Sequence, residues 1–280
     1  NIGGTATLIG DPPNIMIGSA AGLTFADFVA VDAPAAIICL VAMIAIFYVL
    51  FGRKFKVADD RKKALMELDE REEIKNPTLL RQSVVMILLV TAGFMLHGSL
   101  GIESCVVALT AAGVLMLISG ERIEDALMHV EWTTLVFFAG LFIIVGSLSE
   151  VGVIGMLAQA LVDVTGGSTF TAMIVLLVAS AVVSSFLDNI PFVATMIPIL
   201  LSMEATGMDV APLWWAVSLG ACLGGNGTLI GASANVVMSD IAKKNGTSIT
   251  FANFMKYGFP IMLVTIAISA VYLIVRFPPM

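Results

Sequence analysis

Two glycine-rich stretches share one pattern of small and polar residues. Residues 3–16 read GGTATLIGDPPNIM, and residues 224–237 read GGNGTLIGASANVV. Each lies between apolar segments, where irregular backbone is tolerated only if it is buried in protein or lines a cavity. Carbonyls at the end of the leading half-helix can bind a cation, and N–H groups at the start of the following half-helix can bind an anion or polar oxygen. We therefore expect two broken helices with an ion or substrate site between them.

The match between the two copies covers polar and apolar positions. The aligned residues are Gly3 with Gly224, Gly4 with Gly225, Thr7 with Thr228, Leu8 with Leu229, Ile9 with Ile230, Gly10 with Gly231, Asn14 with Asn235 and, after a short insertion, Phe25 with Phe251 and Pro34 with Pro260. Side-chain oxygens of Thr5, Thr7, Asn226 and Thr228 would add to two roughly symmetric cation niches. The alternative is that the glycines only permit close helix packing, which would explain Gly220, Gly224 and Gly225 but not the repeated threonine and asparagine.

Two acidic residues could take part in such a site. Asp188 stands in the sequence DNIP between two apolar arms, and a carboxylate deep in a bilayer costs about 2.5–3.5 kcal/mol on insertion scales. Asp188 could bind a cation or exchange a proton, or it could cap the helix that follows. Asp11 precedes two prolines, so it could equally be a helix cap. The second copy has Ala232 and Ser233 at this place, which leaves its anion niche open.

Composition indicates a membrane protein. Hydrophobic residues make up 59% of the 280 positions and charged residues 12%, against about 25% charged in soluble domains. The three cysteines are isolated in apolar runs, which argues against disulfides and zinc. The sequence lacks a P-loop and a nucleophile–base set, so we expect neither an enzyme nor an ATP-driven pump. We expect no organic cofactor and no nucleic-acid partner, with the lipid bilayer as the surroundings.

Apolar runs and turn signals predict the elements that position these residues. Half-helices and hairpin arms are expected at 12–23, 168–187, 190–203, 212–222 and 233–243. Spanning helices are expected at 34–51, 82–100, 104–119, 133–149 and 259–276, and membrane-surface helices at 124–132 and 151–164. In domain terms, 1–51 is the end of a first repeat, 52–77 a charged linker and 78–280 a second repeat, in which 82–149 are scaffold helices, 168–203 a re-entrant hairpin, 212–243 the broken helix and 259–276 the last span.

The distribution of positive charge predicts the orientation. With 52–77 in the cytoplasm, thirteen of the fourteen lysines and arginines lie inside and only Arg276 lies outside, as the positive-inside rule requires. The first broken helix then runs outward and the second inward, so the repeats are inverted. The second copy is preceded by apolar helices that the first copy lacks, so we expect a comparable segment upstream in a longer protein. The C-terminus is predicted outside.

Three strings carry a family resemblance: NIGGTATLIGDPPN (1–14), SFLDNIPFVATMIPIL (185–200) and GGNGTLIGASANVV (224–237). They resemble the ion transporter superfamily, most closely its branch of arsenite permeases, P proteins and NhaD-like antiporters, whose domain is often labelled citrate-transporter-like. The resemblance implies an all-α, inverted-repeat transporter of the elevator type, an ion-coupled homodimer in a prokaryotic inner membrane. The mobile part would contain both broken helices and the hairpin 168–203.

The resemblance also implies which residues contact substrate and ions. Together with Asp11, the predicted binding residues are Asn1, Gly3, Thr5, Thr7, Asn14, Asp188, Asn189, Pro191, Asn226, Gly227, Thr228, Ser233 and Asn235. A coupling Na⁺ would lie near Thr5, Asp188, Asn189 and Asn226, and H⁺ is the alternative coupling ion.

Two departures from the family pattern bear on the substrate. Dicarboxylate–sodium members carry Ser-Asn-Thr where this chain has Asp188-Asn189-Ile190, and a neutral residue where it has Asp11. Both changes add negative charge, which favours a cation, a proton-exchanged ion or neutral arsenous acid. The leading hypothesis is therefore arsenite-type efflux or Na⁺/H⁺ antiport. The alternatives are a Na⁺-coupled dicarboxylate or citrate symporter, a passive channel, and a non-transporting membrane scaffold.

Overall fold

The computed structural model describes residues 1–280 apart from 53–58, 68–73, 121 and 280. Every regular element in these residues is a helix, and five helices are long and apolar enough to cross a membrane. These five are α3 (Phe25–Phe51), α5 (Pro77–Leu100), α8 (Trp132–Glu150), α10 (Thr169–Phe186) and α14 (Phe251–Arg276). The predicted all-α polytopic membrane fold is confirmed, while the inverted repeat, the re-entrant path of the hairpin and the elevator motion stay predictions.

The remaining helices are shorter. They are α1 (Ile2–Thr5), α2 (Pro12–Ala21), α4 (Asp59–Met66), α6 (Ser104–Ser119), α7 (Ile123–Met128), α9 (Val153–Thr165), α11 (Asn189–Ala205), α12 (Ala211–Gly224) and α13 (Ser233–Lys244). The predicted linker 52–77 lies partly outside the described residues, and its described part contains α4.

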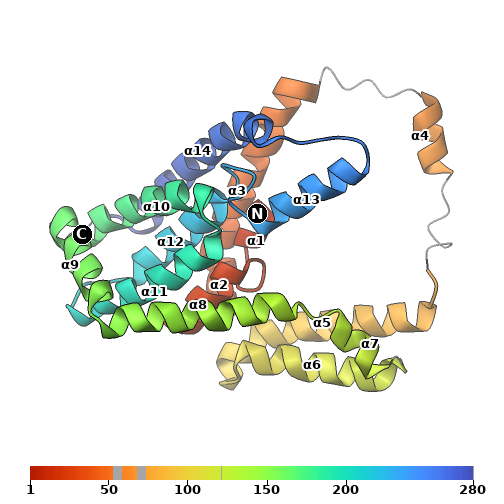
Figure 1. Ribbon diagram of the computed structural model, residues 1–280, viewed down its shortest axis with the longest axis horizontal. Helices are drawn as coiled ribbons and strands as arrows, with labels where there is room; N and C mark the ends of the chain where they lie inside the picture. The colour runs from red at the N-terminus through yellow and green to blue at the C-terminus, as the bar shows by residue number, and fades with distance from the viewer. Residues whose placement is uncertain (53–58, 68–73, 121, 280) are drawn as a thin grey trace. The chain divides into compact units, whose positions relative to one another are not determined.

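The chain forms two compact units. The first contains Asn1–Ile44 and Thr134–Met280, and the second contains Ala45–Thr133. In the second unit α5 packs on α6, where the side-chain amide of Gln82 donates to the carbonyl of Ile118 at 3.0 Å. In the first unit α12 packs with α10 and α11, α2 packs with α11 and α12, and the N-terminus lies close to α1 (Figure 1). The candidate site belongs entirely to this first unit.

Helix α12 is the centre of the first unit, and every residue from Pro212 to Gly224 is buried. It lies directly on the backbone of α10 because Gly220 and Gly224 face that helix. A Cβ atom on Gly220 would come within 2.7 Å of the Leu177 carbonyl oxygen, and one on Gly224 within 2.6 Å of the Ala181 carbonyl oxygen. Close packing is thus the role of these two glycines, as the alternative explanation proposed.

Among the helices that begin earlier than the sequence predicts, two have a proline near the predicted start. Helix α3 begins at Phe25 rather than at 34, and α14 begins at Phe251 rather than at 259. The predicted spans began at Pro34 and one residue before Pro260, but both prolines lie well inside the helices. A proline removes one backbone bond, and neighbouring helices can supply other partners for the freed carbonyls.

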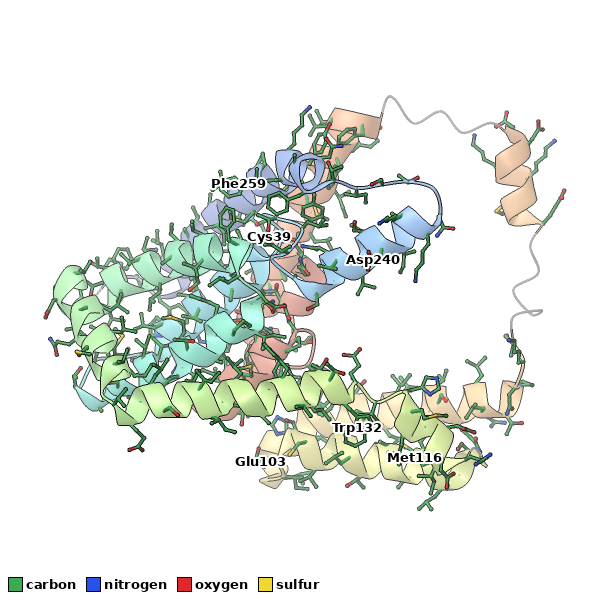
Figure 2. All side chains as sticks on the ribbon, in the orientation of Figure 1. Cys39, Glu103, Met116, Trp132, Asp240 and Phe259 are labelled. Atoms are coloured by element: carbon green, nitrogen blue, oxygen red, sulfur yellow. The ribbon has the colours of Figure 1, made fainter. Side chains whose placement is uncertain are left out.

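Side-chain contacts join these two helices. The hydroxyl of Tyr272 on α14 donates to the carbonyl of Val31 on α3 at 2.7 Å. The sulfur of Cys39, labelled in Figure 2, lies 3.6 Å from the carbonyl oxygen of Thr265. The longer α3 also brings an acidic residue, Asp32, into the core.

Candidate ion and substrate site

Each broken helix is a loop whose two ends touch. In the first break, between α1 and α2, a Cβ atom on Gly10 would lie 2.9 Å from the Cα of Gly4. In the second break, between α12 and α13, a Cβ on Gly231 would lie 3.1 Å from the Cα of Gly225. These are the aligned pairs of the two copies. None of the four has a positive φ, so glycine is needed here for close backbone approach rather than for a left-handed turn.

An asparagine from the following half-helix holds each loop closed. The side-chain amide of Asn14 donates to the carbonyls of Thr5 and Thr7, at 3.2 and 3.1 Å. In the second break the amide of Asn235 donates to the carbonyls of Gly225 and Thr228, at 2.7 and 3.0 Å. Both asparagines are buried. The two predicted binding residues therefore satisfy the carbonyls that a broken helix leaves without partners.

A third asparagine joins the two breaks. The amide nitrogen of Asn1 donates to the side-chain oxygens of Asn226 and Asn235, at 3.1 and 3.2 Å. The amide nitrogen of Asn226 is itself buried and has no partner among the described residues. An unpaired buried donor is costly, so this group would gain by binding an acceptor oxygen of a ligand.

The turn between α10 and α11 contacts both breaks, one residue for each. The amide of Asn189 donates to both carboxylate oxygens of Asp11, at 3.2 and 3.3 Å. The hydroxyl of Ser233 donates to the carboxylate of Asp188 at 3.1 Å. The other oxygen of Asp188 accepts the backbone N–H of Ile190 at 3.1 Å, which makes Asp188 the N-cap of α11. Asp188 is thus the helix cap that was considered for it, while its role in binding a cation or a proton stays a prediction.

Asp11 occupies the N-cap position of α2, yet within the described residues its side chain makes no capping bond. Its carboxylate is instead held by Asn189, as described above. Asp11 therefore has the backbone position of a helix cap, but its carboxylate faces the candidate site instead of capping α2.

These contacts enclose a pocket of about 230 Å³. Its walls come from the first break, the tip of the hairpin and the start of α13: Asn1, Gly4, Gly10, Asp11, Pro12, Asn189, Ile190, Ala232, Ser233 and Ala234. The sequence prediction that the two breaks and the hairpin tip come together thus agrees with the geometry. The role of each residue in binding stays a prediction.

The two helix starts at this pocket differ in their chemistry. At α2 two prolines provide no N–H groups and Asp11 adds a carboxylate, whereas α13 begins with Ser233 and Ala234, which have theirs. Among the described residues that line the pocket none is lysine or arginine. One side of the pocket is therefore suited to a cation, and the other to an acceptor oxygen.

The other predicted binding residues lie around this pocket rather than on its walls. Thr5 is fully buried and donates to the carbonyl of Asn1 at 3.0 Å. Thr228 is also fully buried and donates to the carbonyl of Ser185. Gly227 packs against the side chain of the same serine. Gly3 and Pro191 are not among the described residues that line the pocket. Of the four residues predicted around Na⁺, only Asn189 lines it.

Sequence reasoning missed one buried acid, Asp32 on α3. It is fully inaccessible, and its carboxylate lies 2.5 Å from the hydroxyl of Ser218 on α12. The signal was present, because an acidic residue within an apolar span is a functional candidate by default. The prediction passed over it because the span was started at Pro34, two residues too late to include Asp32.

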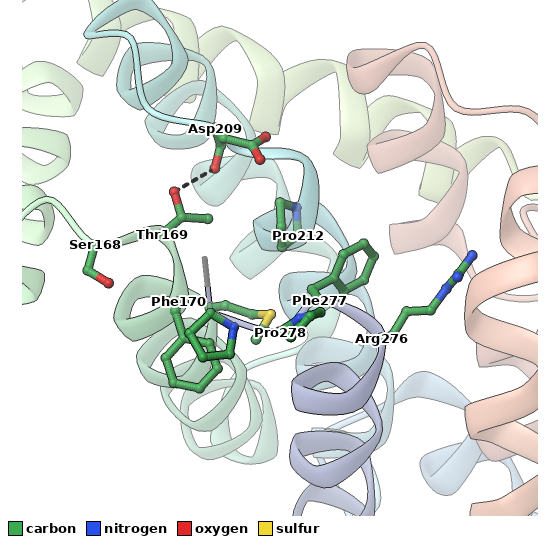
Figure 3. Close-up of a pocket in the computed structure, with 10 residues that line it drawn as sticks. Ser168, Thr169, Phe170, Asp209, Pro212, Arg276, Phe277 and Pro278 are labelled. Atoms are coloured by element: carbon green, nitrogen blue, oxygen red, sulfur yellow. Dashed lines mark hydrogen bonds between the residues drawn. The ribbon is translucent and has the colours of Figure 1, made fainter.

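A second hollow lies at the opposite ends of α10 and α14 (Figure 3). It measures about 520 Å³, and its walls include Thr169, Asp209, Pro212 and Arg276. Thr169 donates to the backbone carbonyl of Asp209 at 3.1 Å, and Arg276 extends away from both. This larger hollow contains none of the repeated residues, so we place the candidate site at the smaller pocket.

Comparison of the sequence with known proteins identifies a family and several relatives. The sequence matches the citrate transporter family (CitMHS) over residues 1–220. It is 46% identical to an uncharacterized transporter of Mycobacterium tuberculosis, over 99% of this chain and 65% of that protein. It is 33% identical to an uncharacterized transporter of Synechocystis, over 97% and 65%. It is 40% identical to the P protein of Mus musculus, over 75% of this chain and 27% of that protein. The chain spans just under two thirds of the length of its bacterial relatives.

Proposed function

Because the chain belongs to the citrate transporter family, we propose that its protein is a secondary active transporter that moves a small inorganic ion or oxyanion in exchange for, or together with, Na⁺ or H⁺. Arsenite-type efflux and Na⁺/H⁺ antiport are the two forms of this proposal. The supporting observation is the pocket where the two breaks and the hairpin tip meet, with the carboxylates of Asp11 and Asp188 beside it.

The chemistry of the pocket supports a divided site. The carboxylates attract a cation at close range, because charges a few ångströms apart interact strongly where water is scarce. The start of α13, where Ser233 and Ala234 line the pocket, would bind an acceptor oxygen. An ion and a small oxygen-bearing substrate could therefore occupy the pocket together, as coupled transport requires.

A second candidate is Na⁺-coupled symport of citrate or a dicarboxylate. The description of the matching family favours it, as do the N–H groups at α13. Against it stand the two carboxylates and the lack of lysine and arginine among the described lining residues. A multiply charged carboxylate would be repelled unless cations bound first.

The proposal includes a cellular setting. The protein would lie in the prokaryotic inner membrane as a homodimer, with 52–77 in the cytoplasm and the C-terminus outside. Within each subunit the breaks and the hairpin would move together in an elevator-like transition. Their mutual hydrogen bonds support this grouping, because Asn1, Asn189 and Ser233 join segments far apart in the sequence.

Asp188→Asn is expected to reduce uphill transport about tenfold or more, the factor that corresponds to 1.4 kcal/mol. Asparagine keeps an oxygen for the cap of α11 but removes the charge that attracts the cation. The measurement is flux into proteoliposomes that contain the full-length protein, with Na⁺, arsenite and citrate tested separately under an imposed Na⁺ or pH gradient. The matched control is Asp240→Asn, an exposed position on α13 outside the pocket (Figure 2).

The outcomes separate the alternatives. Uphill movement of citrate alone would favour the symporter, and flux that never exceeds the equilibrium distribution would indicate a channel. No flux of any of the three probes by the wild-type protein would favour a non-transporting scaffold. Normal uphill flux in Asp188→Asn would remove Asp188 from the mechanism.

A further inference from the structure

The buried carboxyl of Asp32 is unusual because half of it has no partner. The side chain is fully inaccessible, and its Oδ1 atom has no hydrogen-bond partner among the described residues. Its Oδ2 atom lies 2.5 Å from the hydroxyl of Ser218. No lysine or arginine pairs with it in the described part of the chain. A charged carboxylate is poorly solvated in such a place, whereas a neutral carboxyl is tolerated.

The groups that face Asp32 set its electrostatic surroundings. Cys222 approaches from α12 and Tyr272 from α14, and both are neutral in their ordinary protonated forms. Asp11 acts on the same cysteine from the first break. On its own helix the nearest acid is Asp27, whose carboxylate accepts bonds from Thr24 at the start of α3. None of these groups provides a positive charge for an ionised Asp32.

The hydroxyl of Ser218 connects Asp32 to the first break. It lies 2.5 Å from Asp32 and 2.8 Å from the side-chain oxygen of Asn14. The orientation of the Asn14 amide is determined by its partners, because the carbonyls of Thr5 and Thr7 can only accept. Its oxygen therefore points to α12. Ser218 has one hydroxyl hydrogen, so it can donate to Asp32 or to Asn14 but not to both.

The single hydrogen of Ser218 makes the network depend on protonation. When Asp32 carries a proton, its Oδ2–H donates to Ser218, and Ser218 donates to Asn14. When that O–H bond breaks and the proton leaves to water, the Asp32 carboxylate accepts the hydrogen bond that the Ser218 hydroxyl had donated to Asn14. Asn14 then keeps only the weaker S–H donor of Cys222, 3.3 Å away. The residue that holds the first break closed is therefore bound differently in the two states.

We propose that Asp32 is the proton-binding group of this transporter, and that Ser218 and Asn14 transmit its protonation to the first broken helix. This inference rests on the proposed function and names the coupling ion within it as H⁺. The second repeat has no acidic residue at the equivalent position. The offset that aligns Phe25 with Phe251 places Gly258 opposite Asp32. Gly258 packs against the backbone of Asn226 and leaves no room for a side chain.

The first test observes the proton without requiring transport. Infrared difference spectra of the full-length protein, recorded as the pH is raised from acid to alkaline, should show loss of a protonated carboxyl band. The band should be absent from Asp32→Asn and unchanged in Asp27→Asn, the same substitution on the same helix. Ser218→Ala should shift the band without removing it. A band that never titrates, or one that survives in Asp32→Asn, would overturn the proposal.

The second test links the proton to flux. In proteoliposomes, a pH gradient should drive uphill movement of the ion that the wild-type protein transports, and Asp32→Asn should abolish that drive. The control Asp27→Asn, on the same helix but outside this network, should keep the response to the pH gradient within about twofold of the wild type, which is a change of less than about 1.4 kcal/mol. If the wild type transports nothing, the proposed function fails; if it transports and Asp32→Asn keeps the full response to pH, only the role of Asp32 fails.

Discussion

Replacement of Asn235 by alanine is expected to open the second break and to abolish transport. The amide of Asn235 satisfies the carbonyls of Gly225 and Thr228, and its oxygen accepts from Asn1. A buried carbonyl that loses its partner costs about 1–3 kcal/mol, and this variant leaves two without the amide. Thermal unfolding of the detergent-purified protein and flux in proteoliposomes would measure both effects. Asn14→Ala should act in the same direction on the first break.

A matched control lies on the same helix. Asn245 follows α13, and its amide donates to the carbonyl of Ile241 at 2.9 Å, but it is exposed. Water can replace that bond, so Asn245→Ala should change the unfolding temperature little. Equal destabilisation by the two substitutions would show that Asn235 has no special part in holding the break.

Gly10→Ala is expected to separate the two ends of the first break. The new methyl group would lie 2.9 Å from both the Cα and the carbonyl carbon of Gly4, and backbone cannot yield as a flexible side chain does. Overpacking of this kind costs about 1–3 kcal/mol, and the displaced loop would move Asp11 away from Asn189. We expect loss of flux together with a lower unfolding temperature.

Gly155→Ala provides the comparison for that experiment. Gly155 lies inside α9, and among the described residues no atom lies within 4 Å of an added Cβ. Alanine at an interior helical position should be neutral or slightly stabilising. Full flux in Gly10→Ala would mean that the touching glycines are a packing detail without consequence for the site.

The positions of the breaks could be predicted from the sequence because their residues are repeated. Glycine, threonine and asparagine recur in register, and some of the recurring pairs make equivalent contacts, such as Gly10 against Gly4 and Gly231 against Gly225. Asn14 and Asn235, for example, bind the carbonyls of the aligned Thr7 and Thr228. The partners themselves could not be predicted, since nothing local in the sequence tells whether an amide faces a ligand or the backbone of its own loop.

Other features depended on tertiary contacts that no local pattern reports. Proline is a strong signal for a helix start in water, yet Pro34 and Pro260 lie within α3 and α14. The missing bond is tolerated there because other helices pack against this part of the chain. The same misplacement concealed Asp32, whose meaning depends on Ser218 of a helix far away in the sequence. The sequence therefore lacked one kind of information: which residues of helices far apart in the chain contact each other.

The hydrogen bonds between the hairpin tip and the two breaks bear on selectivity. The Asp11 carboxylate accepts hydrogen bonds from Asn189, and the Asp188 carboxylate accepts one from Ser233. A neutral ligand that donates to these carboxylates merely exchanges one hydrogen bond for another, so its net gain is only about 0.5–1.5 kcal/mol. A cation gains more, because its charge acts on both carboxylates at short range. We therefore expect the pocket's own side chains to compete with uncharged donors, which favours Na⁺/H⁺ antiport over efflux of neutral arsenous acid among the two proposed forms.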